Sequence, residues 1–291
     1  MTTLGVVFRP QLPPERLRAM VRTAEEAGLD ELWLWEDCFL ESGIASAAAA
    51  LAWSERLRVG VGLLPVPLRN AALTTMEAAT LHRLFPDRVM LGVGHGVQDW
   101  MGQVGARAES PLTLLREHLD AMRALLAGER VTVRGRYVHL DGVKLDWPPA
   151  SAPTVYAGAR GPRSVRLTGE AADGTILDAS TTPEGVRRAR QLIAEGREAA
   201  GREGAHPVVV YLLTATGPDA EARLRAEQRR EGLDGVAALG AAGDAEDVAK
   251  AVRRLAEAGA DTVVLQPTAD EPDPEGFIRF VTDEVRPLVS P

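Results

Sequence analysis

Apolar and polar residues follow two rhythms along the chain. Short runs rich in β-branched residues, such as LGVVF at 4–8 and DTVVL at 261–265, separate longer stretches with apolar residues every three or four positions, such as ERLRAMVRTAEEAG. The first pattern is typical of buried strands and the second of amphipathic helices. The sequence therefore predicts strands alternating with helices, and Gly28 and Gly259 are expected as C-terminal caps of two of the helices.

Eight strands are expected from this pattern. Their apolar runs are continuous, which indicates strands buried on both faces, as parallel strands covered by helices are. Eight such units predict an α/β fold, a single (β/α)8 TIM barrel over residues 1–291, with a doubly wound open sheet as the alternative. The expected strands are residues 4–8, 31–35, 57–64, 88–94, 154–158, 174–177, 207–214 and 261–265.

Two insertions lengthen the expected barrel. Residues 129–149 predict a small antiparallel excursion after the fourth strand, and residues 217–242 predict a helical insertion after the seventh. Neither has the apolar content of a separate domain core. Residues 44–53, IASAAAALAW, are apolar nearly all round. A helix there needs cover on its outer side, and we expect a homodimer interface to supply it.

The net charge of the chain disfavours some classes of binding partner. With 33 basic and 41 acidic residues, the chain has a formal net charge of −8, which disfavours a broad electrostatic grip on nucleic acid or on a membrane surface. The one cysteine, Cys38, cannot form an intrachain disulfide. No apolar run reaches the roughly 20 residues of a membrane helix, and no signal peptide is recognised. We expect a cytoplasmic protein with a small-molecule substrate.

Candidate site residues are expected where the strands end, because barrels of this kind build their active sites at the carboxyl ends of the strands. Of the five histidines, His95 alone follows a strand, between Gly94 and Gly96. This distribution offers no converging set of metal ligands, so no metal site is predicted. The other strands end at Phe8-Arg9, Glu36-Asp37-Cys38, Leu63-Leu64-Pro65, Gly158-Ala159-Arg160, Asp178-Ala179-Ser180, Thr214 and Gln266-Pro267.

The stretch YAGARGPRSVRLTGEAADG at 156–174 predicts an anion site. A loop with Arg160 and Arg163 follows the strand, and a helix begins after Gly161-Pro162. Proline in the first helical turn sacrifices no hydrogen bond, and the free N–H groups and the helix dipole favour an anion such as phosphate. The alternative is a solvated loop with incidental arginines. Nucleophile-elbow, Walker and G-x-G-x-x-G motifs are not found in the required context.

Three stretches together resemble the luciferase-like monooxygenase superfamily of flavin- and deazaflavin-dependent oxidoreductases. AEEAGLDELWLWED is similar to its first helix and second strand, RVGVGLLPVPLRNAALTTMEAATLHRLFPDRVMLGVGHG to its third strand through its fourth, and YAGARGPRSVRLTGEAADG to its phosphate loop. The similarity runs from Leu4 to about Leu177 and returns in AGADTVVLQP. It implies a (β/α)8 barrel that holds an isoalloxazine or deazaflavin ring in its mouth.

The resemblance also implies how the ring is held. In the coenzyme F420 branch, a bulge with a non-proline cis peptide at the end of the third strand backs the ring, and GVGLLPVP places it at Gly62-Leu63. The alternative is that Gly60 and Gly62 only relieve crowding in a barrel strand. The expected cofactor-binding residues are Gly62, Leu63, Leu64, Gly94, Gly158, Ala159, Arg160, Gly161, Pro162 and Arg163.

The end of the second strand departs from the family pattern, which often has Asp-His where this chain has Asp37-Cys38. His95 is therefore the expected acid or base, because a near-neutral pKa suits proton transfer, and Glu36 and Asp37 are further catalytic candidates. The alternatives are that His95 donates to a strand-end carbonyl and that the two carboxylates cap the next helix. The expected substrate-lining residues are Arg9, Cys38, Gln98, Trp100 and Gln266, and Trp33 and Trp35 are assigned to packing.

The resemblance implies hydride transfer between bound coenzyme F420 and a small organic substrate. FMN with oxygen chemistry is the alternative, since a deazaflavin does not activate oxygen as a reduced flavin does. The bulge and the GARGP loop resemble deazaflavin users and favour F420. A non-catalytic flavin-binding barrel is a second alternative, supported by the missing Asp-His pair.

Overall fold

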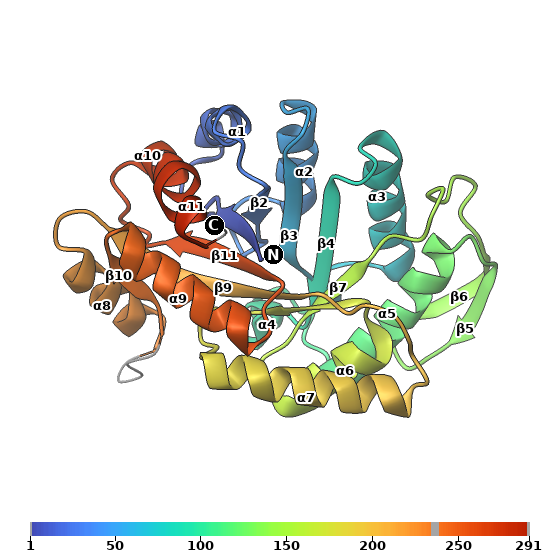
Figure 1. Ribbon diagram of the computed structural model, residues 1–291. Coiled ribbons are helices and arrows are strands. Elements are labelled where there is room, and N and C mark those ends of the chain that lie inside the picture. The colour runs from blue at the N-terminus through green and yellow to red at the C-terminus, as the bar shows by residue number, and fades with distance from the viewer. Residues whose placement is uncertain (1, 234–238, 290–291) are drawn as a thin grey trace.

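The eight expected strands form a closed parallel barrel in the computed structural model of the protein, which describes residues 2–233 and 239–289 (Figure 1). The sheet runs in the order β9-β11-β1-β2-β3-β4-β7-β8, and pairing of β8 with β9 closes it. This confirms the TIM barrel and excludes the open sheet. The strands are β1 (Thr3–Val7), β2 (Glu31–Leu34), β3 (Arg58–Pro65), β4 (Val89–Gly94), β7 (Val155–Gly158), β8 (Gly174–Leu177), β9 (Val208–Thr216) and β11 (Thr262–Pro267).

Helices follow the strands along the chain and surround the barrel (Figure 1). Gly28, after the first helix, has a φ of 66°, and Gly259, the C-cap of α9, has a φ of 114°, so both expected glycine caps are confirmed. The α-helices are α1 (Leu17–Glu26), α2 (Gly43–Ala52), α3 (Ala71–Leu84), α4 (Gln98–Gln103), α5 (Pro111–Leu126), α6 (Pro162–Ala171), α7 (Pro183–Ala199), α8 (Ala220–Arg230), α9 (Ala245–Ala258), α10 (Pro274–Arg279) and α11 (Arg286–Val289). Short turns of other helix types are η1 (Pro14–Arg16), η2 (Val66–Leu68) and the π-helix η3 (Phe280–Val285).

Two apolar layers follow from the alternation of side chains along each strand. One face of every strand packs against the helices and forms the larger core, with Leu32 and Leu34 as examples from β2. The other face fills the barrel interior, where Trp33 is fully buried and meets the rings of Tyr156 and Tyr211 edge-on. These aromatic rings pack against one another inside the barrel.

Strand β3 has a bulge at the expected position. Gly62 and Leu63 together oppose Gly92 of β4, where the register between the two strands shifts. The prediction of a cis peptide at Gly62-Leu63 is wrong, since the cis peptide bond of the described chain joins Cys38 and Phe39. One extra residue in β3 is enough to bend the strand, so the bulge forms with trans peptides.

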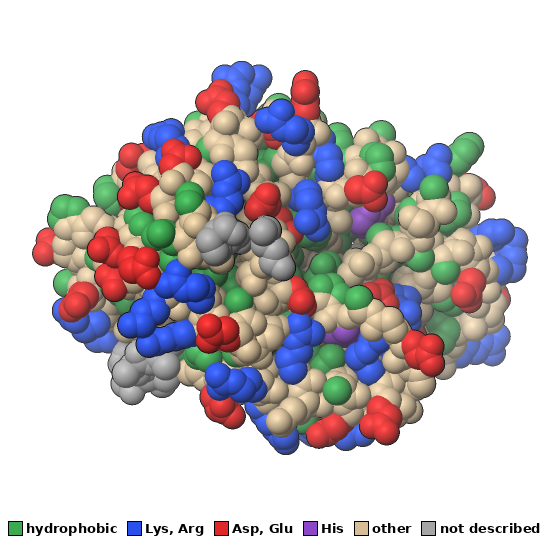
Figure 2. Space-filling model, in the orientation of Figure 1, with side chains coloured by type: hydrophobic (Ala, Val, Ile, Leu, Met, Phe, Trp, Pro, Cys, Tyr) green, Lys and Arg blue, Asp and Glu red, His purple; other side chains and the backbone are tan. Residues whose placement is uncertain are grey.

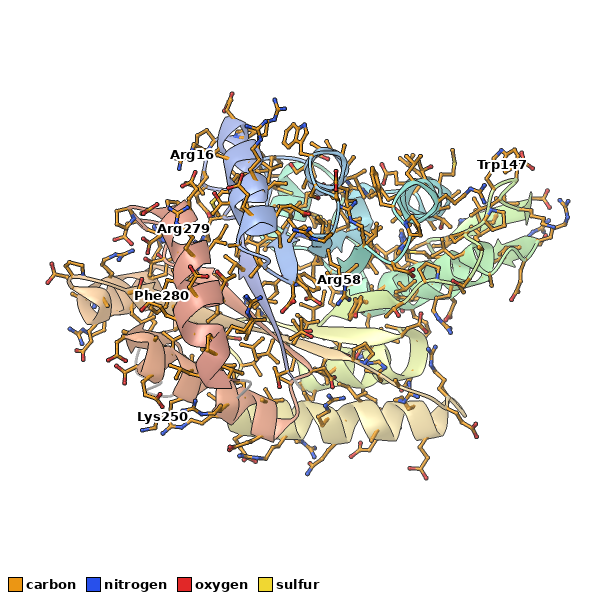
Figure 3. The ribbon with its side chains drawn as sticks, turned by 45° about the horizontal axis from the view of Figure 1, so that its top comes forward. Arg16, Arg58, Trp147, Lys250, Arg279 and Phe280 are labelled. Atoms are coloured by element: carbon orange, nitrogen blue, oxygen red, sulfur yellow. The ribbon has the colours of Figure 1, made fainter. Side chains whose placement is uncertain are left out.

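The segment that follows α5 leaves the barrel as an antiparallel hairpin of β5 (Val131–Arg134) and β6 (His139–Val143). The hairpin extends to one side of the molecule in Figure 1, and Figure 3 places Trp147 at the outer end of this region. The Trp147 side chain is 72% exposed and lies 5.3 Å from the Arg83 guanidinium carbon, measured to the ring centroid.

Residues 217–242 contribute helix α8 and the short strand β10 (Ala241–Gly243), which pairs in parallel with β9. Residues 234–238 of this expected insertion lie outside the described residues. The surface in Figure 2 shows acidic and basic side chains interspersed. None of the helices in the described ranges is long and apolar enough to cross a membrane.

Candidate active site

Three glycines face the barrel interior where β3, β4 and β7 end. A Cβ atom at Gly94 would lie 2.4 Å from Leu63 Cδ2, and one at Gly158 would lie 2.3 Å from the same methyl carbon. A Cβ atom at Gly62 would lie 2.3 Å from the hydroxyl oxygen of Tyr211. No side chain rises from these three positions, so the Leu63 side chain can lie across Gly94 and Gly158, and the Tyr211 hydroxyl can lie against Gly62. We call this part of the barrel mouth the glycine hollow.

Exposed apolar side chains flank the strand ends that form the glycine hollow. Phe39 is 63% exposed and Leu40 is 50% exposed, in the loop after β2, and Val97 is 46% exposed, in the loop after β4. Strand β3 with its bulge lies between β2 and β4 in the sheet. These loops therefore supply apolar surface that can exclude water from a ligand in the mouth.

Two of the expected cofactor-binding residues do not line the glycine hollow. Leu64 is fully buried in the outer core, where its side chain lies near Gly43 of α2. Ala159 is buried directly after β7, and its N–H donates to the carbonyl of Ile176 at 3.1 Å. Both residues belong to the core between the barrel strands and the surrounding helices.

Glu36 is held in place at the end of β2. The Arg69 guanidinium binds both carboxylate oxygens, with 2.8 Å between Nη2 and Oε2, and Oε2 also accepts the N–H of Gly43 at 2.8 Å. The N–H of Glu36 donates to the carbonyl of Leu63 at 3.3 Å. The side chains of Glu36 and Arg69 are 10% and 13% exposed. Glu36 therefore caps α2 and ties it to the bulge, in agreement with the capping alternative.

Asp37 has different surroundings from its neighbour. One carboxylate oxygen accepts the indole N–H of Trp35 at 3.0 Å. Burial raises the pKa of Asp37, and the Trp35 hydrogen bond and the charge of Arg9 oppose that shift. Burial also raises the pKa of the neighbouring Cys38 thiol, with the charges of Glu36 and Asp37 acting in the same direction. Asp37 is therefore a carboxyl group that retains a proton at higher pH than an ordinary aspartate, beside a neutral thiol.

His95 follows β4 and has both ring nitrogens engaged. Nδ1 lies 3.2 Å from the carbonyl oxygen of Pro111, and Nε2 lies 3.0 Å from the hydroxyl oxygen of Ser164. A carbonyl can only accept, so a neutral ring donates from Nδ1 and accepts the Ser164 hydroxyl at Nε2. Burial lowers the pKa of His95 and favours this neutral form. The ring joins the first turns of α5 and α6.

The expected anion loop lies at the start of α6. Gly161 is the N-cap and Pro162 the first helical residue, and both are exposed, as is Arg163. A Cβ atom at Gly161 would meet nothing within 4 Å, so the helix N-terminus is open to a ligand. Arg160 is exposed and forms an ion pair with Asp178 at the end of β8.

Helix α8 covers the opposite side of the mouth. Arg9, which is 4% exposed, donates to Glu227 of α8 at 2.8 Å and to the carbonyl of Pro267 at 3.3 Å. Gln266 is also buried, and its amide donates to Glu231 at 3.1 Å. These two expected substrate-lining residues are therefore engaged with α8 and with its C-cap, Glu231.

Two further expected substrate-lining residues, Gln98 and Trp100, lie on α4, which begins three positions after His95. The side-chain amide of Gln98 donates to the carbonyl of His95 at 3.2 Å and braces this loop. Trp100 is half-buried, and the following Met101 is fully buried.

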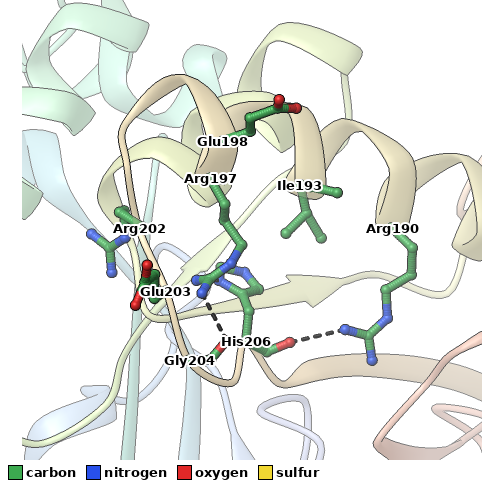
Figure 4. Close-up of a pocket in the computed structure, with 9 residues that line it drawn as sticks. Arg190, Ile193, Arg197, Glu198, Arg202, Glu203, Gly204 and His206 are labelled. Carbon is green, nitrogen blue, oxygen red and sulfur yellow. Dashed lines mark hydrogen bonds between the residues drawn. The ribbon is translucent and has the colours of Figure 1, made fainter.

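Two open depressions lie apart from the glycine hollow. One, of about 630 Å³, lies where β9 begins, at the amino-terminal end of the barrel (Figure 4). Its arginines are already engaged, since Arg197 donates to the carbonyl of Gly204 at 2.8 Å and Arg190 to that of His206 at 2.9 Å. The other, of about 770 Å³, lies beyond the carboxyl end of β9, and its residues include Arg223, Asp270, Glu271 and Phe277.

The sequence profile described as luciferase-like monooxygenase matches residues 4–233. The chain belongs to the luciferase-like monooxygenase family. The 5,10-methylenetetrahydromethanopterin reductase of Methanolobus tindarius is 33% identical over 202 residues, which cover 69% of this chain and 61% of that protein. The F420-dependent glucose-6-phosphate dehydrogenase of Nocardia farcinica is 32% identical over 210 residues, which cover 66% and 62%. The matched region thus spans about three fifths of the length of each relative.

A solved structure within the same fold superposes along the whole chain. It is an F420-dependent secondary alcohol dehydrogenase in complex with an F420–acetone adduct, with a TM-score of 0.88, 22% identity and coverage of 100% of this chain and 99% of that one. At this identity the likeness shows a shared fold.

Three residues of this family member were missed at the sequence level. Arg69 binds Glu36. Its only signal in the sequence is that it is a charged residue directly after the apolar run PVPL, which follows the third strand. Glu227 lies mid-helix in an insertion and gave no signal. Tyr211 interrupts the aliphatic run VVVYLL, and its hydroxyl is a polar group in a strand otherwise buried on both faces.

Proposed function

We propose that the protein is an oxidoreductase that transfers a hydride between bound coenzyme F420 and a small organic substrate. The glycine hollow is the observation that best supports this function. The glycines let the Leu63 side chain lie close to the strand ends, where it can support a flat ring, and the open start of α6 suits the phosphate of such a coenzyme. The F420-dependent relative, at 32% identity, supports the choice of carrier.

The proposal assigns positions to the residues of the mouth. Leu63 would back the ring, and Gly94 and Gly158 would leave room for the Leu63 side chain beneath it. The N–H groups at Gly161 and Arg163 would hold the phosphate, with the Arg163 side chain adding charge. The bound coenzyme supplies the carbon that accepts or releases the hydride. Apolar residues around the mouth exclude water from that step.

Asp37 is the group that we assign to proton transfer with the substrate. Its raised pKa suits a carboxyl that must hold a proton at higher pH than an ordinary aspartate does. Glu36 has its carboxylate occupied by Arg69 and Gly43. His95, with both nitrogens bonded, is assigned to positioning the start of α6. The role of His95 as acid or base stays a prediction, which single-turnover rates of His95→Asn and Asp37→Asn variants will decide.

The test is a fluorescence titration of the purified protein with F420 and, separately, with FMN, followed by oxidation and reduction of the bound coenzyme. We expect saturable binding of F420 and weaker binding of FMN. Tight binding of FMN without binding of F420 would instead favour the FMN-dependent monooxygenase, which the family description also supports. Coenzyme binding without turnover of any ketone, alcohol or imine substrate would favour the non-catalytic barrel.

We also propose a homodimer through α2 and α3. The outer face of α2 presents small residues, including the exposed Ala45 and Ala52, and on α3 Leu73 is 48% exposed and Met76 is 55% exposed. A second copy of the chain would cover this apolar surface. Light scattering should give a dimer mass, and Met76→Glu should give a monomer. A monomer mass for the unaltered protein would contradict the proposal.

A further inference from the structure

Tyr211 lies inside the barrel on β9, and its hydroxyl group has no hydrogen-bond partner among residues 2–233 and 239–289. The side chain is 3% exposed. Its ring meets Trp33 and Trp35 edge-on, with centroids 6.2 and 5.6 Å away and interplanar angles of 83° and 82°. These two rings pack against the phenol and favour the orientation in which its hydroxyl is unpaired.

Gly62 shows where the hydroxyl lies. The position of a Cβ atom on Gly62 is 2.3 Å from the Tyr211 oxygen, so the oxygen rests against the bulge of β3 from inside the barrel. The next residue, Leu63, lies across Gly94 and Gly158. The hydroxyl is therefore directly beneath the backbone on which a ring in the glycine hollow would press.

An unpaired hydroxyl at this depth needs a physical explanation. A buried polar group without a partner costs folding free energy, and phenylalanine would make the same ring contacts without that cost. Burial raises the pKa of Tyr211, so the group keeps its proton and can donate. The hydroxyl lies against the bulge at Gly62, and a peptide carbonyl such as that of Leu63, which accepts the N–H of Glu36, can accept a second hydrogen bond.

We propose that Tyr211 is a positioning residue for a flat heterocyclic ligand: when the ligand lies in the glycine hollow, the Tyr211 hydroxyl donates to a peptide carbonyl of the Gly62-Leu63 bulge and fixes the bulge against the ring. This inference rests on the proposed function, because it needs a ring in the hollow. The ligand-free protein keeps the donor unpaired, and ligand binding pairs it. Tyr211 thus makes binding stronger at the expense of the stability of the empty protein.

The test compares Tyr211→Phe with the unaltered protein in two measurements. Thermal unfolding of the ligand-free protein should shift upwards by about 2 °C or more, because an unpaired group is removed. The dissociation constant for F420, or for FMN if that is the coenzyme bound, should rise about tenfold, because the hydrogen bond of the bound state is lost. Opposite effects on stability and affinity do not arise from a residue that only fills space.

Tyr156→Phe is the matched control. Tyr156 is also buried in the barrel interior and meets Trp33 edge-on, but its hydroxyl is not among the unpaired buried atoms of the described chain. It should leave the dissociation constant unchanged.

A double substitution tests the placement independently. Gly62→Ala should destabilise the protein, because the new methyl group meets the Tyr211 oxygen, and adding Tyr211→Phe should recover part of that loss. Absence of any recovery would overturn the placement of the hydroxyl beneath the bulge.

Two results with Tyr211→Phe would overturn the inference while leaving the proposed function intact. One is a higher unfolding temperature with an unchanged dissociation constant, which would mean that the hydroxyl stays idle. The other is a lower unfolding temperature, which would mean that it is paired in the empty protein. Failure of the unaltered protein to bind either coenzyme would instead overturn the proposed function, and this inference with it.

Discussion

Asp37 and Glu36 are adjacent carboxylates that the structure places in unlike surroundings. Both residues follow the end of β2, where Glu36 meets Arg69 and α2 while Asp37 meets the Trp35 indole. Arg69 occupies both carboxylate oxygens of Glu36, whereas burial raises the pKa of Asp37 against the opposing hydrogen bond from Trp35. This difference between neighbours is the physical basis for assigning proton transfer to Asp37.

Replacing Asp37 with Asn should lower kcat about 100-fold while the dissociation constant for the coenzyme changes little, because the amide keeps the shape but cannot supply a proton. For the unaltered enzyme working as an acid, kcat/KM should fall as pH rises through the raised pKa of Asp37. The variant should lose that dependence. Steady-state rates across pH measure both effects, and an unchanged kcat would remove Asp37 from the mechanism.

At the scale of elements, the bulge of β3 is the feature that organises the mouth. Its glycine admits the Tyr211 hydroxyl on one side, and its Leu63 lies over Gly94 and Gly158. The Glu36–Arg69 pair ties this bulge to α2 and to the loop before α3. The rigid barrel thus positions irregular backbone where a ligand is expected to bind.

Arg69→Gln should destabilise the protein by about 3 kcal/mol, because it leaves Glu36 as a buried carboxylate without its cation. Urea unfolding measures the loss. Arg163→Gln, which changes an exposed arginine, is the control and should stay within about 0.5 kcal/mol of the unaltered protein. Equal stability of both variants would contradict the role given to the Glu36–Arg69 pair.

Gly94→Ala should weaken coenzyme binding at least tenfold, because the added methyl group would lie 2.4 Å from Leu63 Cδ2 and must push that side chain into the hollow. Combining it with Leu63→Ala should restore part of the affinity by making room. Fluorescence titration measures both variants. Full affinity in Gly94→Ala would show that the ring does not occupy the glycine hollow.

The strands of this barrel were predictable from sequence because each is a continuous apolar run bounded by polar residues, as in DTVVL, observed as β11 (Thr262–Pro267). The site was predictable only in its location. The bulge at Gly62-Leu63 followed from the family resemblance, but its peptide geometry depends on pairing with β4. The partner of Glu36 is Arg69, 33 positions away in a loop, and no local pattern links two such positions.

For the molecule as a whole, buried neutral histidines couple folding to pH. Burial lowers the pKa of both His118 and His206 from 6.5 to about 4, and neighbouring arginines act in the same direction. His206 accepts from Arg197 at 3.4 Å and lies 2.8 Å from the Thr175 hydroxyl, whereas neither nitrogen of His118 has a partner in the described part of the chain. The unfolded chain therefore binds protons that the folded protein excludes.

The stability contributed by these two histidines should be fully present above pH 6.5 and should be lost as pH falls towards 4, by up to about 3 kcal/mol for each ring. His118→Leu should remove the part of this pH dependence that comes from His118. It should also raise the free energy of unfolding at pH 7 by about 1 kcal/mol, because it eliminates two unpaired nitrogens. Urea unfolding at pH 7 and pH 4.5 measures both effects. An identical pH dependence in the variant would contradict this account.

The most direct measurement is a crystal structure of the protein soaked with coenzyme F420. The account predicts density for a flat ring in the glycine hollow, resting on Leu63 between Gly94 and Gly158, with the phosphate at the first turn of α6. Ring density in the depression beside Arg190 and Arg197, or at any place away from the bulge of β3, would contradict it.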